Sequence, residues 1–265
     1  MIRKPISFQQ GLLWTIATVF VLLVLYSWLS YQQKQINPND TTIPNLSQMW
    51  DAVVILSTPD ARGEYWIIED LKMTYLRHLL GMGVGVGLSL LLGIAMGSSN
   101  RINMALGFPL TCLAKVPPTA MIAVYFVLFG TDLEMYMAMI VFGILPTLTQ
   151  AINQSARQDV PEDSIYKAYT LGASNMEVIC NVIFPQILPR FLETIRLSVG
   201  PALVFLIAAE WMMADIGIGY RLRIQSRLLN MNVVYIYLII LCLTAFVMDW
   251  SLRFSRQKLC PWAEK

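Results

Sequence analysis

Apolar runs as long as a membrane-spanning helix recur along the whole chain. A helix needs roughly 20 apolar residues to cross the hydrocarbon core of a bilayer. The runs that reach or approach this length are 11–29, 79–97, 105–129, 133–149, 193–214 and 233–250. In lipid, only helices and closed barrels satisfy their own backbone, and these runs are too long for barrel strands. The pattern therefore predicts an all-α polytopic membrane protein with about six transmembrane helices.

The first run, 11–29, follows Arg3 and Lys4 and therefore also fits a secretory signal peptide. The apolar part is too long for one, and no small-x-small cleavage site follows it. We therefore expect an uncleaved N-terminal span over 1–31. The run 133–149 is shorter than the others and carries Glu134 near its start.

The charges between the runs predict the orientation, because cytoplasmic loops carry an excess of Lys and Arg. Nine basic residues fall on one side: Arg3, Lys4, Arg101, Arg157, Lys167, Arg190, Arg253, Arg256 and Lys258. Segment 32–70 carries mostly acidic residues and is predicted to be external. We therefore expect a core over 71–255, a cytoplasmic tail over 256–265, and both termini on the cytoplasmic side of a bacterial inner membrane.

Three arginines, Arg221, Arg223 and Arg227, fall in the last external loop and oppose this orientation. They face either an acidic rim on a partner protein or the lipid headgroups. In segment 46–56, apolar residues share one helical face, which suits a helix lying along the outer leaflet or packed on the protein.

Glycines recur at the start of the second run, where 81–87 reads GMGVGVG. The third glycine of a dinucleotide-binding turn is missing, and no strand precedes the stretch. Small residues four positions apart, at 81/85, 83/87 and 93/97, instead predict close packing of helices in lipid.

Composition excludes several classes of site. The net charge of +2 and the lack of a basic run argue against nucleic acid. The cysteines, Cys112, Cys180, Cys242 and Cys260, are scattered, which predicts neither a disulfide framework nor a metal site. The single histidine, His78, could be a proton relay, but a packed or interfacial side chain is the favoured interpretation.

The loop of about 152–191 reads as a helix, a glycine corner and a second helix, and we call residues 161–189 the elbow. Asp159 and Glu162 have the spacing of a capping box, which predicts a first helix over 161–171. Gly172 is the expected left-handed end of that helix. Ser174 and Glu177 form a second capping box, and Pro185 and Pro189 are expected to end the second helix. Such an ordered cytoplasmic loop predicts a docking surface for a soluble partner, although a plain connector is the alternative.

The elbow resembles the "EAA" loop in the permease subunits of binding-protein-dependent ABC importers. The resemblance rests on Tyr166-Lys167-Ala168, Gly172, Val182 and Pro185, supported by TLGAS (170–174) and IFPQILP (183–189). It implies that the elbow docks into a groove of an ATP-hydrolysing subunit. The residues that it implies for this coupling are Tyr166, Lys167, Ala168, Leu171, Gly172, Ala173 and Ser174. Tyr166 and Lys167 depart from the usual Glu and Ala, so Tyr166 would hold its contact by packing or by a hydroxyl hydrogen bond.

The resemblance covers about 70–255 and is strongest to the permeases for nitrate, sulfonates, taurine and bicarbonate. Further matching stretches are LRHLLG (76–81), KVPPTA (115–120), LFG (128–130) and AAEWMMADIGIGY (208–220). The resemblance implies a type I importer with two permease subunits, most simply identical, two ATPase subunits that bind ATP and Mg²⁺, and an external solute-binding protein. This chain itself would bind no cofactor.

Charged residues inside a membrane are costly and point to a solute pathway. Lys115 precedes the paired Pro117 and Pro118, whose freed carbonyls need protein or a water-filled cavity. Glu210 lies near the outer end of the fifth run. These residues are predicted to line the path or its gate, and structural pairing of Lys115 and Glu210 with each other or with polar groups is the alternative.

Two other classes of protein fit the sequence less well. No GxxxxGK[ST] occurs, so a partner must supply the ATPase. A secondary transporter driven by an ion gradient usually shows internal repeats, and none is found. An intramembrane enzyme would need a motif such as HExxH or GxSxG, which is absent.

Overall fold

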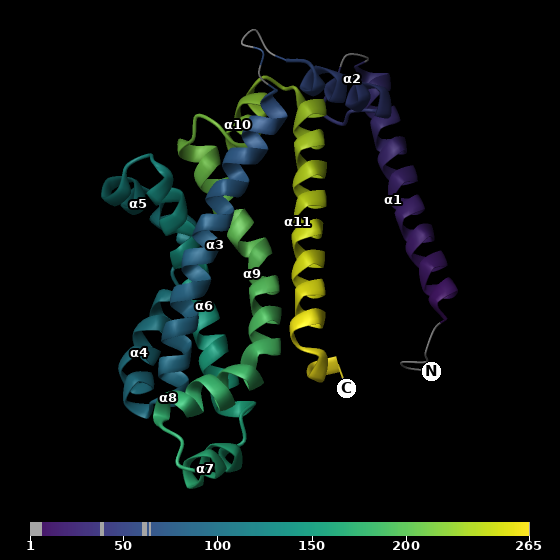
Figure 1. The fold of residues 1–265 in the computed structure, drawn as a ribbon. Coiled ribbons are helices and arrows are strands. Elements are labelled where there is room, and N and C mark those ends of the chain that lie inside the picture. The colour runs from purple at the N-terminus through teal and green to yellow at the C-terminus, as the bar shows by residue number, and fades with distance from the viewer. Residues whose placement is uncertain (1–6, 38–39, 60–62, 64, 265) are drawn as a thin grey trace. The chain divides into compact units, whose positions relative to one another are not determined.

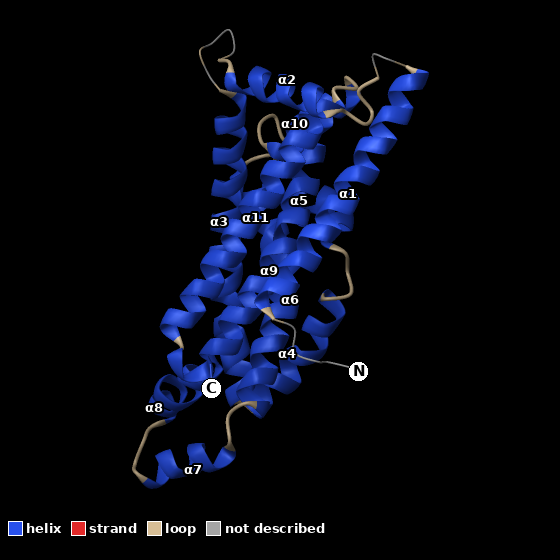
Figure 2. Cartoon of the chain, turned by 90° about the vertical axis from the view of Figure 1, so that its right-hand side faces the viewer, coloured by secondary structure: helices blue, strands red, loops and turns tan. Residues whose placement is uncertain are grey.

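The computed structural model describes residues 7–37, 40–59, 63 and 65–264, and this part of the chain contains helices and no strand (Figures 1 and 2). The α-helices are α1 (Phe8–Ile36), α2 (Leu46–Ser57), α3 (Trp66–Ser98), α4 (Asn100–Leu113), α5 (Ile122–Phe129), α6 (Leu133–Gln158), α7 (Glu162–Thr170), α8 (Asn175–Val178), α9 (Phe184–Met213), α10 (Ile218–Arg227) and α11 (Met231–Leu259). The all-α prediction is confirmed. Arg3 and Lys4, which entered the predicted orientation, lie outside the described residues.

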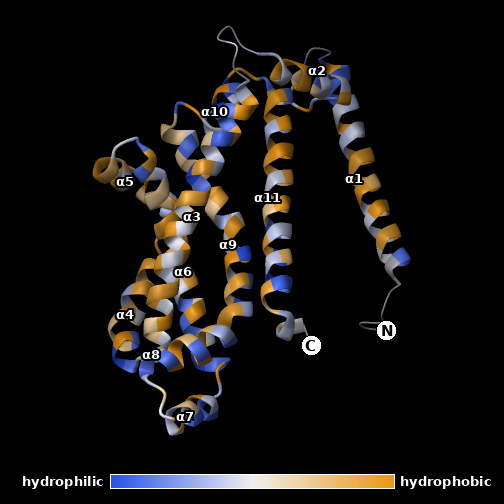
Figure 3. Ribbon diagram, viewed as in Figure 1, coloured by the Kyte–Doolittle hydropathy of each residue, from blue (hydrophilic) through white to orange (hydrophobic). Residues whose placement is uncertain are grey.

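Five helices of the described chain are long and apolar enough to cross a membrane: α1, α3, α6, α9 with its preceding turns, and α11. Colouring by hydropathy shows apolar residues along these helices and polar ones toward their ends (Figure 3). The predicted run 105–129 is not one helix. It is divided between α4 and α5, which follow each other at an angle of 82°. Pro117 lies at this break in an extended conformation (ψ 123°), because the ring of the following Pro118 disfavours a helical backbone at Pro117. Pro117 also has no N–H to donate.

The chain forms two compact units. The smaller unit consists of Met1–Tyr65 and Ile224–Leu238, and the larger unit consists of Trp66–Arg223 and Ile239–Lys265. In the larger unit, α6 is the central helix and packs between α3 and α9. Buried Met139, Ile140 and Ile144 of α6 join Leu203 and Leu206 of α9 in one apolar core.

Close contact between α3 and α6 depends on glycine. A Cβ at Gly81 would lie 2.7 Å from Ile140, and one at Gly85 would lie 2.8 Å from Ile144. One at Gly93 would lie 2.6 Å from Ile152, so side chains at these positions would separate the helices. The predicted packing through small residues is confirmed on this face. A Cβ added at Gly83 or Gly87 would meet no atom of the described chain within 4 Å, so packing at that pair stays a prediction.

In the smaller unit, hydrogen bonds connect α1 to the segment that precedes α2. The hydroxyl of Tyr26 donates to the Pro44 carbonyl (2.6 Å), and Ser30 donates to the Ile43 carbonyl (2.9 Å). The predicted helix at 46–56 is confirmed as α2, which begins with a capping box of Asn45 and Gln48. Its Ala52 and Leu56 are buried, so one face of α2 packs on the protein.

Candidate functional site

The first corner of the elbow is a Schellman motif at the end of α7. Gly172 has φ +88°, the left-handed conformation that glycine adopts without a steric penalty. The Ala173 N–H bonds the Ala168 carbonyl (3.1 Å), and the Gly172 N–H bonds the Tyr169 carbonyl (3.0 Å). The predicted left-handed end of the helix is therefore confirmed.

The second helix of the elbow starts with the predicted capping box. The Ser174 hydroxyl accepts a hydrogen bond from the Glu177 N–H, and the Glu177 carboxylate accepts one from the Ser174 N–H at 2.7 Å. The hydroxyl of Tyr169 also donates to Asn175 (3.0 Å), which ties α7 to α8. These short-range contacts fix the turn at Gly172.

The prediction of a first capping box, at Asp159 and Glu162, is wrong. Pro161 is the N-cap of α7 and offers no side-chain cap. Asp159 instead ends α6, and its carboxylate accepts hydrogen bonds from Arg190 at 2.8 and 3.1 Å. The first helix is accordingly shorter than predicted, Glu162–Thr170 in place of 161–171.

The prolines do not end the second helix of the elbow. Helix α8 passes through a π-helical turn, Ile179–Ile183, into α9, so Asn175–Met213 is one 39-residue helical segment. Pro185 and Pro189 both lie inside this segment, in the first two turns of α9. In the π turn the N–H of Phe184 reaches back five residues to the carbonyl of Ile179, which accommodates the proline.

The two faces of the elbow differ in exposure. Ile165, Ala168 and Ala173 turn inward and pack on a buried cluster that includes Ile152 and Val178. Outward, the exposed fractions are 62% for Tyr166, 88% for Leu171 and 68% for Met176. Of the predicted coupling residues, Tyr166, Lys167, Leu171, Gly172 and Ser174 are exposed, while Ala168 and Ala173 are half-buried. The structure thus brings these residues together on one helical corner, beyond the ends of α4 and α6 (Figure 1).

A cavity of about 460 Å³ lies under the elbow. Ile165 and Tyr169 of the elbow form one wall, and Ala95, Ser99 and Ile102, around the α3–α4 turn, form another. The elbow therefore rests on the bundle along only part of its inner face.

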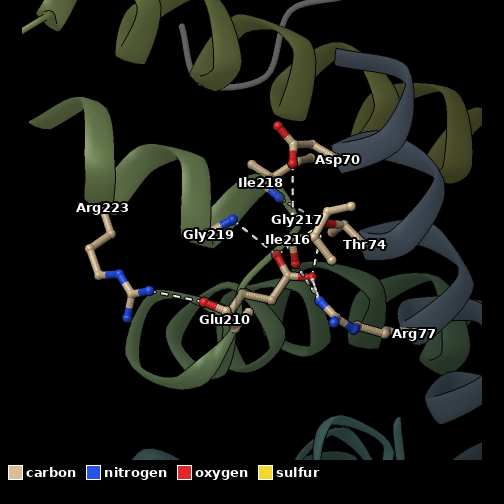
Figure 4. A network of polar contacts seen from close by, with 10 residues as sticks. Asp70, Thr74, Arg77, Glu210, Ile216, Gly217, Ile218, Gly219 and Arg223 are labelled. Carbon is tan, nitrogen blue, oxygen red and sulfur yellow. Dashed lines mark hydrogen bonds and ion pairs between the residues drawn. The ribbon is translucent and has the colours of Figure 1, made fainter. Parts of the chain in front are cut away.

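A second group of functional candidates is a buried polar network where α3 meets the turn after α9 (Figure 4). It consists of Asp70, Thr74, Arg77, Glu210, the backbone of 216–219, and Arg221. Glu210 is fully buried and accepts bonds from Arg77, Thr74 and the Gly219 N–H, each at 2.9 Å. Arg77 also donates to the Ile216 carbonyl (2.8 Å), and its guanidinium lies 4.0 Å above the ring of Tyr136.

The same network fixes the turn itself. Asp70 accepts from the Gly217 N–H (3.0 Å), and Thr74 accepts from the Ile218 N–H (2.9 Å). Gly217 has φ +126°, and a Cβ there would lie 2.6 Å from the Glu210 carboxylate. A Cβ at Gly219 would lie 2.5 Å from the Ile207 carbonyl. The Gly-x-Gly of the sequence is therefore needed to wrap the backbone around a buried carboxylate.

Two of the three arginines that opposed the predicted orientation have partners inside the chain. Arg221 donates to Asp70 (2.8 Å) and lies over Trp66. Arg223 donates to the carbonyls of Met212 and Ala214, both at 2.9 Å, where α9 ends. Neither is free for an acidic rim on a partner. Arg227 is exposed.

Glu210 and Lys115, the charged residues of the predicted pathway, do not contact each other in the described chain. Lys115 is exposed in the bend between α4 and α5, beside Pro117 and Pro118. The contacts of Glu210 match the alternative of structural pairing with polar groups. The role of both residues in a pathway stays a prediction.

Sequence reasoning missed Asp70, Thr74 and Arg77. The sequence did contain a signal for them. Asp70 and Arg77 are two helical turns apart on the same face, at the start of an apolar helix that has to bury them. His78 is completely buried, and neither ring nitrogen has a hydrogen-bond partner in the described chain. This agrees with the packed histidine that was expected.

Ion pairs join α9 to α11 at the end of the bundle that carries the elbow. Glu193 bonds Arg256 (2.9 Å), and Arg196 bonds Asp249 (2.9 Å). The C-terminal end of α11 therefore lies beside the first turns of α9.

Comparison with known families decides the class of protein. Residues 85–259 match the family described as "Binding-protein-dependent transport system inner membrane component". The chain belongs to this family. The predicted family is thereby confirmed, and the chain is a transport component, with ATP hydrolysis left to a separate subunit.

Relatives of this transport component have names that describe them as transport permeases. The taurine transport system permease protein TauC of Escherichia coli (strain K12) is 26% identical over 98% of this chain and 92% of its own. The putative aliphatic sulfonates transport permease protein SsuC of Bacillus subtilis (strain 168) is 30% identical over 72% of this chain and 69% of its own. Among solved structures, an inward-facing conformation of the MetNI methionine ABC transporter matches with a TM-score of 0.61 and 15% identity, over 81% of this chain and 99% of that one. The last match concerns the fold alone.

The family match covers the elbow and the part of the network contributed by α9 and α10, whereas α1, α2 and the first part of α3 precede it. The chain is therefore the permease component of an importer. The secondary transporter and the intramembrane enzyme are excluded as its class.

Proposed function

We propose that this permease moves a small anion, a sulfonate or a related sulfur- or nitrogen-bearing nutrient, into the cell by alternating access. The observation that supports this proposal most strongly is the structure of the elbow. It is an ordered helical corner with large apolar side chains exposed at its tip, and it continues without a loop into a long apolar helix. A connector has no need of such a tip, because exposed apolar groups are costly in water.

The elbow is the docking site for a cytoplasmic ATPase subunit. Two such subunits, each binding ATP and Mg²⁺, would sit under two permease subunits, most simply two copies of this chain. Their closure on ATP would displace the elbows. The membrane is then a bacterial inner membrane, with the elbow, the C-terminal tail and the N-terminus on the cytoplasmic side.

Helix α9 carries the displacement across the membrane. Its 30 residues span about 45 Å at about 1.5 Å per residue. One end joins the elbow through α8, and the other end holds Glu210 in the polar network. The pairs Glu193–Arg256 and Arg196–Asp249 tie α11 to the same movement. A push at the elbow therefore reaches both α11 and the turn at 216–219.

The class of solute is suggested by the relatives, whose names specify taurine and aliphatic sulfonates. Lys115, exposed in the bend between α4 and α5, would offer an anion a transient counter-charge. An external solute-binding protein would deliver the solute, and the exposed Arg227 is available for that protein.

Uptake measurements test this function. A host strain that lacks the chain should lose uptake of labelled taurine, a small alkanesulfonate or nitrate, and the restored chain should return it. Uptake should persist when the proton gradient is collapsed and stop when ATP is depleted. Uptake that follows the proton gradient instead would contradict the proposal, as would unchanged uptake of all three solutes in the deleted strain.

A further inference from the structure

A line of polar side chains runs along the contact between α4 and α6, in the half of the bundle nearest the elbow (Figures 1 and 2). On each helix these residues share one face, because their spacings bring them to nearly the same direction around the helix axis. We call this set the polar seam. It consists of Asn100, Asn103 and Thr111 of α4 and Gln150, Asn153 and Arg157 of α6.

Hydrogen bonds connect the seam from one helix to the other. The amide of Gln150 donates to the Thr111 hydroxyl (3.2 Å), and the amide of Asn153 donates to the side-chain oxygen of Asn103 (2.8 Å). Arg157 donates to the side-chain oxygen of Asn153 (3.1 Å). An amide carries two N–H donors, so Gln150 and Asn153 each keep one beyond these bonds.

The seam reaches into the span and is accessible from outside the chain. Gln150 is eight residues before the end of α6 at Gln158, about 12 Å along the helix at about 1.5 Å per residue. Thr111 is exposed and Gln150 is half-buried. The other exposed face of α4 is apolar, with exposed fractions of 82% for Met104 and 77% for Phe108. Polar groups inside a membrane face protein or a water-filled cavity, so the face with the seam is not the lipid face of α4.

Positive charge accompanies the seam without a nearby carboxylate. Arg157 also donates to the side chain of Asn100 and the carbonyl of Met96, both at 2.8 Å, and these oxygens are neutral. Lys115 follows the seam in the bend after α4. Neither cation forms an ion pair in the described chain. The acidic residue of α4 and α6 is Glu134 alone, in the first turn of α6 at the opposite end of that helix.

We propose that the polar seam lines the half of the solute path nearest the elbow and favours anions there. This inference rests on the proposed function and specifies side chains that the solute passes. The free N–H groups of Gln150 and Asn153 can replace water on the oxygens of a sulfonate or nitrate. Lys115 and Arg157 attract the anion at the two ends. The donors between these cations are neutral, so the anion is held weakly enough to leave.

Two charge variants separate this role from simple helix packing, in which the same hydrogen bonds would only join α4 to α6. Gln150→Glu and Gln150→Lys both remove the amide, and each can keep one bond to the Thr111 hydroxyl, as acceptor or as donor. Uptake of a labelled small alkanesulfonate and of nitrate is measured per amount of folded permease in host membranes. The matched controls are Met104→Glu and Met104→Lys, on the apolar face of α4.

Uptake with Gln150→Glu should be roughly tenfold or more below uptake with Gln150→Lys, because a carboxylate beside the path repels the anion at close range. The two Met104 variants should not differ from each other. Equal uptake with both Gln150 variants, or higher uptake with Gln150→Glu, overturns the seam as an anion path and leaves the proposed function standing. Absence of ATP-dependent uptake with the unaltered chain overturns both.

Access to water gives a second test that does not depend on transport. Gln150→Cys and Met104→Cys are treated in membranes with a membrane-impermeant methanethiosulfonate that carries a sulfonate group. The modified residue is identified by mass spectrometry, so the native cysteines do not interfere. Position 150 should react and position 104 should not. No reaction at position 150, or equal reaction at both positions, overturns the seam as a water-lined path.

Discussion

The elbow and the polar network are both helical corners, but they are built in opposite ways. Contacts that set the elbow corner join residues at most six positions apart, such as Tyr169 and Asn175. The network joins Asp70 to Gly217 and Arg221, 147 and 151 positions away. Its charged groups Asp70 and Glu210 are fully buried, whereas Leu171 at the elbow is 88% exposed. The elbow is thus a local structure open to a partner, and the network is a closed structure that holds the fold.

This difference predicts which substitutions affect stability and which affect coupling. Arg77→Ala should have the largest effect on stability. It leaves the Glu210 carboxylate buried without its cation, and breaking a buried pair in this way costs about 3–5 kcal/mol. Amounts of folded protein in membranes and the thermal unfolding midpoint in detergent should both fall. Leu171→Ala, at the elbow, is the matched control and should change neither.

Equal stability of the Arg77→Ala variant and the unaltered chain would contradict the structural role of the network. In that case Glu210 would not depend on Arg77, and its predicted place in the solute pathway would gain weight.

Gly217→Ala tests the backbone part of the network. At φ +126° an alanine is strained, and its Cβ would meet the Glu210 carboxylate at 2.6 Å. Strain of this kind costs on the order of 1–3 kcal/mol. We expect a lower unfolding midpoint. Gly200→Ala, in α9 with open space around the added Cβ, should leave the midpoint unchanged or raise it.

Gly172→Ala should have a smaller effect on stability and a larger one on transport. The left-handed conformation costs an L-residue about 1–2 kcal/mol, but no atom lies within 4 Å of the added Cβ. The corner can relax locally, so the unfolding midpoint should change little. Solute uptake should fall, because the tip of the elbow is then turned away from its partner. Normal uptake would show that the direction of the corner is unimportant.

Ser174→Ala gives the smallest expected effect. It removes one side of the capping box with Glu177, which is worth about 1 kcal/mol at a helix start. Because the loss is confined to α8, hydrogen exchange should increase at the first amides of α8 and not in α6. Ser174→Thr, which keeps the hydroxyl, should restore protection. Unchanged exchange in Ser174→Ala would show that the capping box does not hold the corner.

The same contrast explains what the sequence could predict. The box at Ser174 and the corner at Gly172 were readable, because the residues that make them are neighbours in the chain. Asp70, Thr74 and Arg77 could be recognised as polar residues on one face of an apolar helix, but their partners could not. Glu210 on α9 and the turn at 216–219 lie more than 130 positions away, and only the packing of α3 on α9 brings them to α3. The prediction from Pro185 failed because a π-helical turn accommodates this proline within the helix. The prediction from Asp159 failed because its carboxylate is bound by Arg190 of α9.

The central claim is that the elbow is held by a nucleotide-hydrolysing partner. A photoreactive benzophenone side chain in place of Leu171 tests it most directly, with the same probe in place of Leu46, 75% exposed on α2, as the control. After irradiation of host membranes, position 171 should be joined to a protein that contains GxxxxGK[ST], and position 46 should not. Capture of lipid alone at position 171, or capture of that protein equally from both positions, would contradict the account.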